Sequence, residues 1–293
     1  MKRNTVVDQY CGWGGGALGF HNAGFECLLA VDYDKHPRKC FKLNFPGVPV
    51  KGWDLLRLTG SVLREYLKLQ PLDLDVLMMS PSCQGISKAG KMDPYDLRNI
   101  MFLHSIKNGI PGVMPKVFVI ENVANLDEGR MQVFGDMVKG ELDKLHDYVW
   151  DVRKMNALHF STPSDRERMI FVGVHKSLSK DATFPEPQTP TATGLRIQDV
   201  LPEIDGLMYG YGFTKFKAPD EFANTVTKTV NLKAYVNHET VKLTIPQVLK
   251  LCGYPADWKY SGNYDQVWGR AGNSVMPRLS EAIAIHLRDQ VLP

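Results

Sequence analysis

The chain begins by alternating short apolar runs with stretches that have the apolar spacing of helices. The apolar runs TVVDQY and ECLLAVDYD predict strands, and ALGFHNAGF and HPRKCFKLNF predict helices. A glycine-rich turn joins the first strand to the first helix. The order strand, turn, helix, strand, helix is typical of the opening of a parallel α/β sheet.

The same alternation continues up to residue 175. Buried strands are predicted for LDLDVLMMS, KVFVIENV and ERMIFVGV, because each is a nearly continuous apolar run. Helices are predicted between them for VLREYLKL and MVKGELDKLHDY. We therefore predict an α/β fold built on a mostly parallel sheet.

The pattern changes after His175. The following segment, KSLSKDATFPEPQTPTATG, is rich in Pro, Thr and Ser without periodicity, which predicts a linker and a domain boundary near Lys180. Residues 206–236 suit short strands and loops, and the C-terminal part returns to helical periodicity. We predict a large domain of residues 1–178, completed by 268–293, and a small domain of residues 179–267.

The composition is that of an ordinary globular protein and excludes several classes. No apolar run is long enough to span a bilayer, so no membrane role is expected. The five cysteines include no CxxC pair and no cluster at zinc-ligand spacing, which argues against a disulfide scaffold and a structural metal site. The first residues lack the apolar stretch of a signal peptide, so we expect a cytoplasmic protein. The net charge of +3 permits nucleic-acid binding without requiring it.

The glycine-rich turn is the first candidate for chemistry. Gly12 and Gly14 lie between a predicted strand and a helix, where glycines let a ligand approach the backbone and leave helix amides free to donate. The next strand ends at Asp32, whose carboxylate could accept both ribose hydroxyls of an adenosine-containing ligand, and Tyr33 could stack on the adenine. NAD and S-adenosylmethionine both fit this pattern. A turn that only packs a helix on the sheet, with Asp32 as a solvated strand end, fits it as well.

Three further clusters lie at strand ends, where open α/β sheets bind their ligands. Cys83 follows the third buried strand and could be a nucleophile, although a lone cysteine is more often an inert buried residue. Glu121 ends the next strand and could donate a proton, or only form a cap or an ion pair. Arg166 and Arg168 precede the last strand and could bind a carbonyl, a phosphate or neighbouring carboxylates.

In this order, the clusters resemble the motifs of DNA cytosine-5 methyltransferases. VVDQYCGWGGGALGF resembles the family's cofactor motif DLFxGxGGxxxGF, and SPSCQGIS resembles its nucleophile motif PPCQxFS. DLRN, IENV and RERMIFVG resemble DxRN, ENV and RxRxxxxG. Nearer the C-terminus, KLTIPQVLKLCGYP and AGNSVMP resemble RxLTxxExxxLxGFP and IGNxVPP. No motif is decisive alone, but their order and spacing are specific.

The resemblance implies a Rossmann-like fold that uses S-adenosylmethionine, with a small domain that recognises the target site in double-stranded DNA. It implies that the following residues bind the cofactor: Tyr10, Gly12, Gly14, Asp32, Tyr33, Asp54, Leu55, Asn273 and Val275. Cys83 would attack C6 of a cytosine rotated out of the duplex, so that C5 accepts the methyl group. Glu121 would hold N3, Arg168 would hold O2, and Arg166 would belong to the same catalytic group.

The resemblance places DNA contacts after the nucleophile and in the small domain. The candidates are Gln84, Ser87, Lys88, Lys91, Arg98, Tyr211, Lys215, Thr227 and Lys228. Loops of the small domain would read base edges in the major groove, and one side chain would fill the gap left by the extruded base. Each of these residues alone could equally belong to an ordinary polar surface.

Four departures from the family's patterns bear on the expected activity. Ser82 replaces the proline before the nucleophile and is expected to loosen that turn. The other three departures are Ser164 for glutamine, Gly16 for an aromatic residue and Lys242 for arginine. None of them removes a chemical group that the mechanism requires. We expect an active, monomeric enzyme that uses no metal.

Three alternatives stay open. A transfer-RNA cytosine-5 methyltransferase is the nearest, because one branch of the family methylates transfer RNA, but the CFT tripeptide of that branch is absent from this sequence. A catalytically weak DNA-binding homologue is the second, and only Ser82 favours it. A nicotinamide-dependent dehydrogenase would explain the glycine-rich turn, but neither Cys83 nor the GNSV stretch near the C-terminus.

Overall fold

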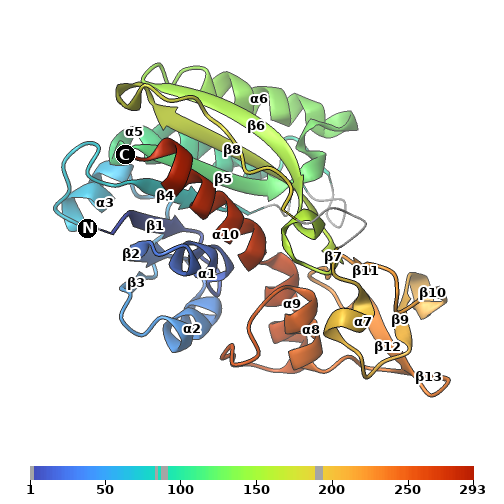
Figure 1. The fold of residues 1–293 in the computed structure, drawn as a ribbon. Coiled ribbons are helices and arrows are strands. Elements are labelled where there is room, and N and C mark those ends of the chain that lie inside the picture. The colour runs from blue at the N-terminus through green and yellow to red at the C-terminus, as the bar shows by residue number, and fades with distance from the viewer. Residues whose placement is uncertain (1–2, 83–84, 87–91, 189–193) are drawn as a thin grey trace.

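The computed structural model describes residues 3–82, 85–86, 92–188 and 194–293. Its main feature is a seven-stranded sheet in the order β3-β2-β1-β4-β5-β8-β6 (Figure 1). β8 pairs antiparallel with both β5 and β6, and the other four strand pairs of this sheet are parallel, so the prediction of a mostly parallel sheet is confirmed. The strands are β1 (Thr5–Gln9), β2 (Glu26–Val31), β3 (Val50–Lys51), β4 (Val76–Met79), β5 (Val117–Val123), β6 (Tyr148–Asn156) and β8 (Glu167–His175).

Helices cover both faces of this sheet, which explains why its inner strands are nearly continuous apolar runs. In β1, Val6 packs in the apolar cluster of one face and Val7 in that of the other. The first cluster includes residues of α1 (Gly15–Asn22), α2 (Lys35–Asn44) and α10 (Pro277–His286). The second includes residues of α3 (Gly60–Tyr66), α4 (Ile100–His104), α5 (Ile110–Val113) and α6 (Gln132–Leu142).

Helix α10 packs directly against α1. A Cβ atom added to Gly19 would lie 2.6 Å from the backbone oxygen of Pro277 and would overlap the backbone of Glu281, so the two helices approach closely. The hydroxyl of Ser280 also donates to the backbone oxygen of Gly16, 2.9 Å away. Segments from near both ends of the chain therefore border the same part of the sheet (Figure 1).

A second, antiparallel sheet has the strand order β10-β9-β12-β13 (Figure 1). Its strands are β9 (Gly206–Tyr209), β10 (Lys215–Lys217), β12 (Leu232–Val236) and β13 (Glu239–Val241), accompanied by α7 (Ile197–Val200), α8 (Ile245–Leu251) and α9 (Tyr264–Asn273). The short strands predicted here are therefore present. A two-residue pairing of β7 (Ser164–Asp165) with β11 (Ala223–Asn224) links this region to the segment before β8. The exact domain boundaries stay a prediction.

Strand β6 was not predicted from the sequence. It lies at the edge of the main sheet and pairs only with β8. Its residues, YVWDVRKMN, include three charges, and exposed positions interrupt the apolar ones. An edge strand that is half solvated lacks the continuous apolar run that marks the inner strands, and charges on such edges oppose pairing with other chains.

Among the residues that the structure describes, no helix combines the length and the apolarity needed to cross a bilayer. The same residues contain no group of three or more His, Cys, Asp or Glu side chains placed to hold a metal ion.

Candidate active site

The carboxyl ends of β1, β2, β4 and β5 border one large cleft. Its volume is about 1190 Å³. Residues 225–228, which follow β11, and residues 272–275, at the end of α9, form part of its wall. The cleft is therefore larger than an ordinary pocket for one small ligand.

The glycine-rich turn and the end of β2 form one corner of this cleft. Gly12 has a φ of 54°, and a Cβ atom added to it would meet nothing within 4 Å, so its backbone is open to a ligand. The Gly12 N–H donates to Oδ2 of Asp32, and the Asp34 N–H donates to Oδ1, both at 2.8 Å. Burial raises the pKa of Asp32, while these two N–H groups oppose that rise. The carboxylate is therefore held in one orientation with lone pairs left for a ligand.

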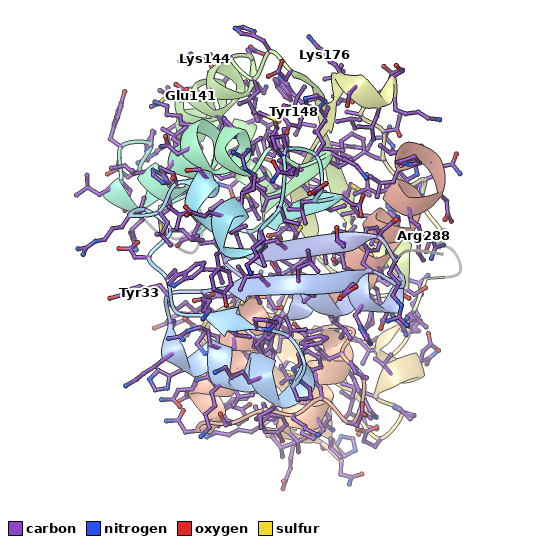
Figure 2. All side chains as sticks on the ribbon, turned by 90° about the vertical axis from the view of Figure 1, so that its left-hand side faces the viewer. Tyr33, Glu141, Lys144, Tyr148, Lys176 and Arg288 are labelled. Carbon is purple, nitrogen blue, oxygen red and sulfur yellow. The ribbon has the colours of Figure 1, made fainter. Side chains whose placement is uncertain are left out.

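Aromatic and apolar side chains continue the wall beside Asp32. The Tyr10 hydroxyl shares a hydrogen bond with Oγ of Ser105 at 2.9 Å. Burial raises the pKa of Tyr10 to about 12. Leu55 is buried, whereas Tyr33 is 75% exposed and projects outward beyond the sheet (Figure 2). The predicted cofactor residues that line the cleft are Tyr10, Gly12, Asp32, Tyr33, Asp54, Leu55, Asn273 and Val275.

Gly14 is the one predicted cofactor residue that is not among the residues lining the cleft. It precedes α1 with a φ of 105°, and a Cβ atom there would lie 2.8 Å from the ring of Phe45 and 3.1 Å from the ring of Phe41. Its N–H donates to the backbone oxygen of Cys11, 2.9 Å away. Gly14 therefore shapes the turn and lets α2 pack closely, and its predicted contact with a cofactor stays a prediction.

Asp8 lies beneath the glycine-rich turn and was missed from the sequence. It is 2% exposed, its Oδ2 accepts the N–H of Ala17 at 3.1 Å, and it borders the cleft. Burial and, to a smaller extent, the nearby Asp32 raise its pKa from 3.8 to about 8, against the effect of the Ala17 N–H. The sequence did contain a sign of this buried carboxylate, because Asp8 is the only charged residue in the run TVVDQY.

Replacing Asp8 with asparagine is expected to remove a loss of stability at alkaline pH. Between its ordinary pKa of 3.8 and its folded value of about 8, the folded protein keeps a proton that the unfolded chain has released. Stability therefore falls as pH rises through this window. The Asp8→Asn variant stays neutral and can still accept from Ala17. Thermal unfolding at about pH 5.5 and about pH 8 should show a smaller drop in Tm for the variant.

The matched control is Asp136→Asn, because Asp136 is an exposed residue of α6. It should keep the wild-type dependence of Tm on pH. An Asp8→Asn variant that loses as much Tm between the two pH values as the wild type would contradict the assignment.

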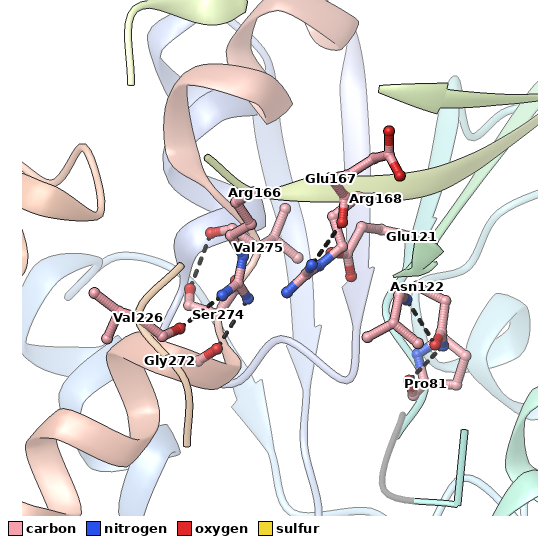
Figure 3. Close-up of polar contacts among 11 residues, drawn as sticks. Pro81, Glu121, Asn122, Arg166, Glu167, Arg168, Val226, Gly272, Ser274 and Val275 are labelled. Carbon is pink, nitrogen blue, oxygen red and sulfur yellow. Dashed lines mark hydrogen bonds and ion pairs between the residues drawn. The ribbon is translucent and has the colours of Figure 1, made fainter. Parts of the chain in front are cut away.

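Residues 121–125 anchor the chain on both sides of Cys83. Nδ2 of Asn122 donates to the backbone oxygen of Pro81 at 3.0 Å (Figure 3), and Nδ2 of Asn125 donates to that of Ile86 at 2.7 Å. Cys83 itself lies outside the described residues, so its role stays a prediction. Neither asparagine was given a role from the sequence, although Asn122 belongs to the IENV motif and Asn125 follows that motif closely.

Glu121 and Arg168 meet at the wall of the cleft, on the neighbouring strands β5 and β8. Nε of Arg168 lies 2.9 Å from Oε1 of Glu121, and the two side chains are 13% and 10% exposed (Figure 3). Nη1 of Arg168 also donates to the backbone oxygen of Glu167 at 2.7 Å. Glu121 and Arg168, which are predicted to hold the same base, are thus fixed relative to each other by this ion pair.

Arg166, the other arginine predicted for the catalytic group, holds distant backbone segments together. Its side chain is almost completely buried, although it borders the cleft. Nη1 donates to the backbone oxygen of Val226 at 3.0 Å, and Nη2 donates to those of Gly272 and Ser274, both at 2.9 Å (Figure 3). The guanidinium therefore ties the start of β8 to two distant segments of the cleft wall, and its predicted catalytic role stays a prediction.

The predicted DNA-binding residues divide into three groups. Arg98, Thr227 and Lys228 line the cleft, and Arg98 donates through Nε to Oδ1 of Asp96 at 2.8 Å. Tyr211 and Lys215 are exposed on the second sheet and its connection, and they do not line the cleft. The remaining candidates, Gln84, Ser87, Lys88 and Lys91, lie outside the described residues, so their roles stay predictions.

The mostly parallel sheet with one antiparallel strand, and the cleft at its carboxyl edge, define a protein with the Rossmann-like methyltransferase fold. The sequence model of the family described as C-5 cytosine-specific DNA methylase matches residues 4–218. Because this match covers more than half of the chain, the chain belongs to that family.

Particular relatives agree with this assignment. The type II methyltransferase M.XorII of Xanthomonas oryzae is 34% identical over 201 residues, which cover 68% of this chain and 47% of that protein. The chain thus spans about half the length of this relative. M.HpaII of Haemophilus parainfluenzae is 27% identical over 321 residues, covering 94% and 86% of the two chains. The structure of Spodoptera frugiperda DNMT2 is similar in fold, with a TM-score of 0.71, 15% identity and coverage of 97% and 98%.

Proposed function

We propose that this chain transfers a methyl group from S-adenosylmethionine to C5 of a cytosine rotated out of duplex DNA. The observation that carries the proposal is the Glu121 and Arg168 pair, in the cleft that also contains the corner of Gly12 and Asp32. Membership of the C-5 cytosine-specific DNA methylase family supports cytosine in DNA as the target.

The corner beside the glycine-rich turn suits S-adenosylmethionine. Asp32 is oriented to accept ribose hydroxyls, and the open space at Gly12 lets the ligand lie against the backbone. Tyr10 and Leu55 offer an apolar wall for the adenine. Bound there, the cofactor supplies an electrophilic methyl group on a sulfonium centre.

The protein's own residues would make C5 of the cytosine nucleophilic. The Cys83 thiolate forms a bond to C6, and the electron pair of the C5–C6 double bond moves to C5 and towards N3. Glu121 donates to N3 and Arg168 donates to O2, so that the charge developing on the ring is neutralised. C5 then accepts the methyl group. Loss of the C5 proton to a base restores the double bond and expels the Cys83 thiolate.

Three other cysteines are held as thiols, which supports the assignment of the nucleophile to Cys83. Burial raises the pKa of the Cys11, Cys27 and Cys252 thiols well above the usual range. Cys11 borders the cleft, but the buried carboxylates Asp8 and Asp32 also disfavour its thiolate.

A methyl-transfer assay tests the proposed function directly. The purified chain is incubated with S-adenosylmethionine carrying a tritiated methyl group and with genomic DNA that was amplified in vitro and is therefore unmethylated. Transfer RNA serves as the second substrate. Label should appear in the DNA as 5-methylcytosine, and the same DNA synthesised with 5-methylcytosine throughout should accept none.

Each other outcome identifies an alternative. Label in transfer RNA alone would assign the chain to the RNA branch of the family. Specific DNA binding without transfer to either substrate would indicate a catalytically weak binding protein. Bisulfite sequencing of the labelled DNA would then identify the recognised site.

A further inference from the structure

Three buried side chains form a hydrogen-bonded chain behind the cofactor corner. Nε1 of Trp13 donates to the hydroxyl of Tyr254 at 2.7 Å. The Tyr254 hydroxyl shares a short hydrogen bond with Oγ of Ser274, and that Oγ donates to the backbone oxygen of Val275 at 3.0 Å. Trp13, Tyr254 and Ser274 are 2%, 5% and 8% exposed, so solvent does not compete for these bonds.

The chemistry of the groups fixes the direction of this chain. An indole N–H can only donate and a backbone carbonyl can only accept, so each of the two hydroxyls accepts from one neighbour and donates to the next. Burial also raises the pKa of Tyr254, which keeps its hydroxyl protonated and able to donate. Removing the Tyr254 hydroxyl would therefore break two bonds and leave the Trp13 N–H without its acceptor.

The three side chains come from separate segments that must meet at this point. Trp13 belongs to the glycine-rich turn, Tyr254 follows α8, and Ser274 follows α9. A Cβ atom at Gly15 would overlap Ser274 Oγ and the Val275 carbonyl, so the start of α1 packs tightly on these groups. The rings of Trp13 and Tyr254 also meet edge to face, with centroids 5.2 Å apart.

Tyr254 differs by its hydroxyl from the motif that this segment resembles. The motif that LCGYP resembles has phenylalanine at this position, and the motif of the glycine-rich turn leaves position 13 open. This chain pairs a tyrosine at the first position with an indole donor at the second. A ring alone would fill the same space, so the hydroxyl serves the hydrogen bonds.

We propose that Trp13, Tyr254 and Ser274 form a positioning relay that holds residues 273–275 against the cofactor corner. Arg166 holds the same segment from the other side, through the backbone oxygens of Gly272 and Ser274 (Figure 3). A wall that is already ordered spares the ligand the entropic cost of ordering it, so the relay raises cofactor affinity. This inference rests on the proposed use of S-adenosylmethionine, because Asn273 and Val275 border its predicted pocket.

The test uses Tyr254→Phe, which removes the hydroxyl and keeps the ring. The Kd for S-adenosylmethionine, measured by calorimetry, should rise about five- to tenfold, as expected for the loss of one net buried hydrogen bond. The kcat at saturating cofactor should stay within about twofold, because no group that touches the base changes. In the absence of cofactor, the amide hydrogens of residues 271–276 should exchange faster in Tyr254→Phe than in the wild type. This measurement needs no ligand.

Tyr148→Phe is the matched control. Its hydroxyl is also buried and donates to a backbone oxygen, that of Pro115 at 2.7 Å. Tyr148 lies far from Tyr33 and the cofactor corner (Figure 2). This variant should lose stability without a change in cofactor affinity or in exchange at residues 271–276. The double variant Trp13→Phe with Tyr254→Phe should weaken binding less than the sum of the single changes, because both break the same bond.

The proposal is overturned if Tyr254→Phe keeps both wild-type affinity and wild-type exchange, or if Tyr148→Phe weakens cofactor binding equally. If Tyr254→Phe does not fold, Ser274→Ala is used instead, because it removes the hydrogen bond between Tyr254 and Ser274 by deleting one oxygen. The same measurements of affinity and exchange then test the proposal. A wild-type protein that binds no S-adenosylmethionine would count against the proposed function. In that case the exchange of residues 271–276 would still test the relay.

Discussion

Replacing Cys83 with serine is expected to abolish methyl transfer, with kcat reduced by about 10⁴-fold or more. A serine hydroxyl is far weaker as a nucleophile than a thiolate, and no other residue in the proposed mechanism can form the bond to C6. Duplex DNA containing 5-fluorocytosine gives the second readout, because the C5 fluorine cannot leave as a cation. The wild-type protein should stay attached to this DNA in denaturant, and Cys83→Ser should not.

The Kd for S-adenosylmethionine separates a chemical defect from a folding defect. Cys83→Ser should bind the cofactor nearly as the wild type does, since none of the residues around Gly12 and Asp32 changes. Cys27→Ser is the control, because Cys27 lies near the start of β2, away from the strand ends that border the cleft. It should keep both transfer and trapping. Methylation retained by Cys83→Ser would refute the covalent mechanism.

The inner part of the main sheet could be predicted because both of its faces are buried. Strands such as β4 and β5 must then be apolar at successive positions, and such runs are visible in a single sequence. The edge strand β6 has one solvated side and no such run. The second sheet could be predicted as short strands but not in its order, because that order depends on pairings of only three or four residues.

The candidate site could be predicted where side chains carry the chemistry and stand at strand ends. Asp32, Glu121 and Arg168 are of this kind, and all three border the cleft. The role of Arg166 could not be predicted, because its acceptors are backbone oxygens of residues 226, 272 and 274. Every residue has such an oxygen, so only the folded chain reveals which ones converge.

The hydrogen-bonded chain of Trp13, Tyr254 and Ser274 was hidden for a related reason. No residue of the three stands out in its own segment of the sequence. Trp13 and Tyr254 are 241 positions apart in the chain. A departure from a family's motif can be interpreted when the new side chain contacts a specific partner in the folded structure. Gly16 and Ser164 were visible departures, whereas the Tyr254 hydroxyl gained meaning only from the indole beside it.

Replacing Glu121 with glutamine is expected to lower kcat by about 10²- to 10³-fold, the range for loss of a positioned general acid. Glutamine has nearly the same shape. Its carbonyl can still accept from Arg168, and its amide can still donate to N3 of the base, so the KM for DNA should change little. The amide cannot release a proton to N3, and charge developing on the ring is no longer neutralised. Single-turnover methyl transfer on duplex DNA measures this effect.

The matched control for Glu121 is Glu141→Gln. Glu141 also belongs to ion pairs, with Lys144 at 2.8 Å and Lys107 at 3.3 Å, but it lies on α6 far from Tyr33 and the cofactor corner (Figure 2). Loss of its pairs should leave kcat unchanged. If Glu121→Gln instead raised the KM for DNA and kept kcat, Glu121 would bind the base without activating it. The proton at N3 would then have to come from another donor, and the role assigned to the pair with Arg168 would be wrong.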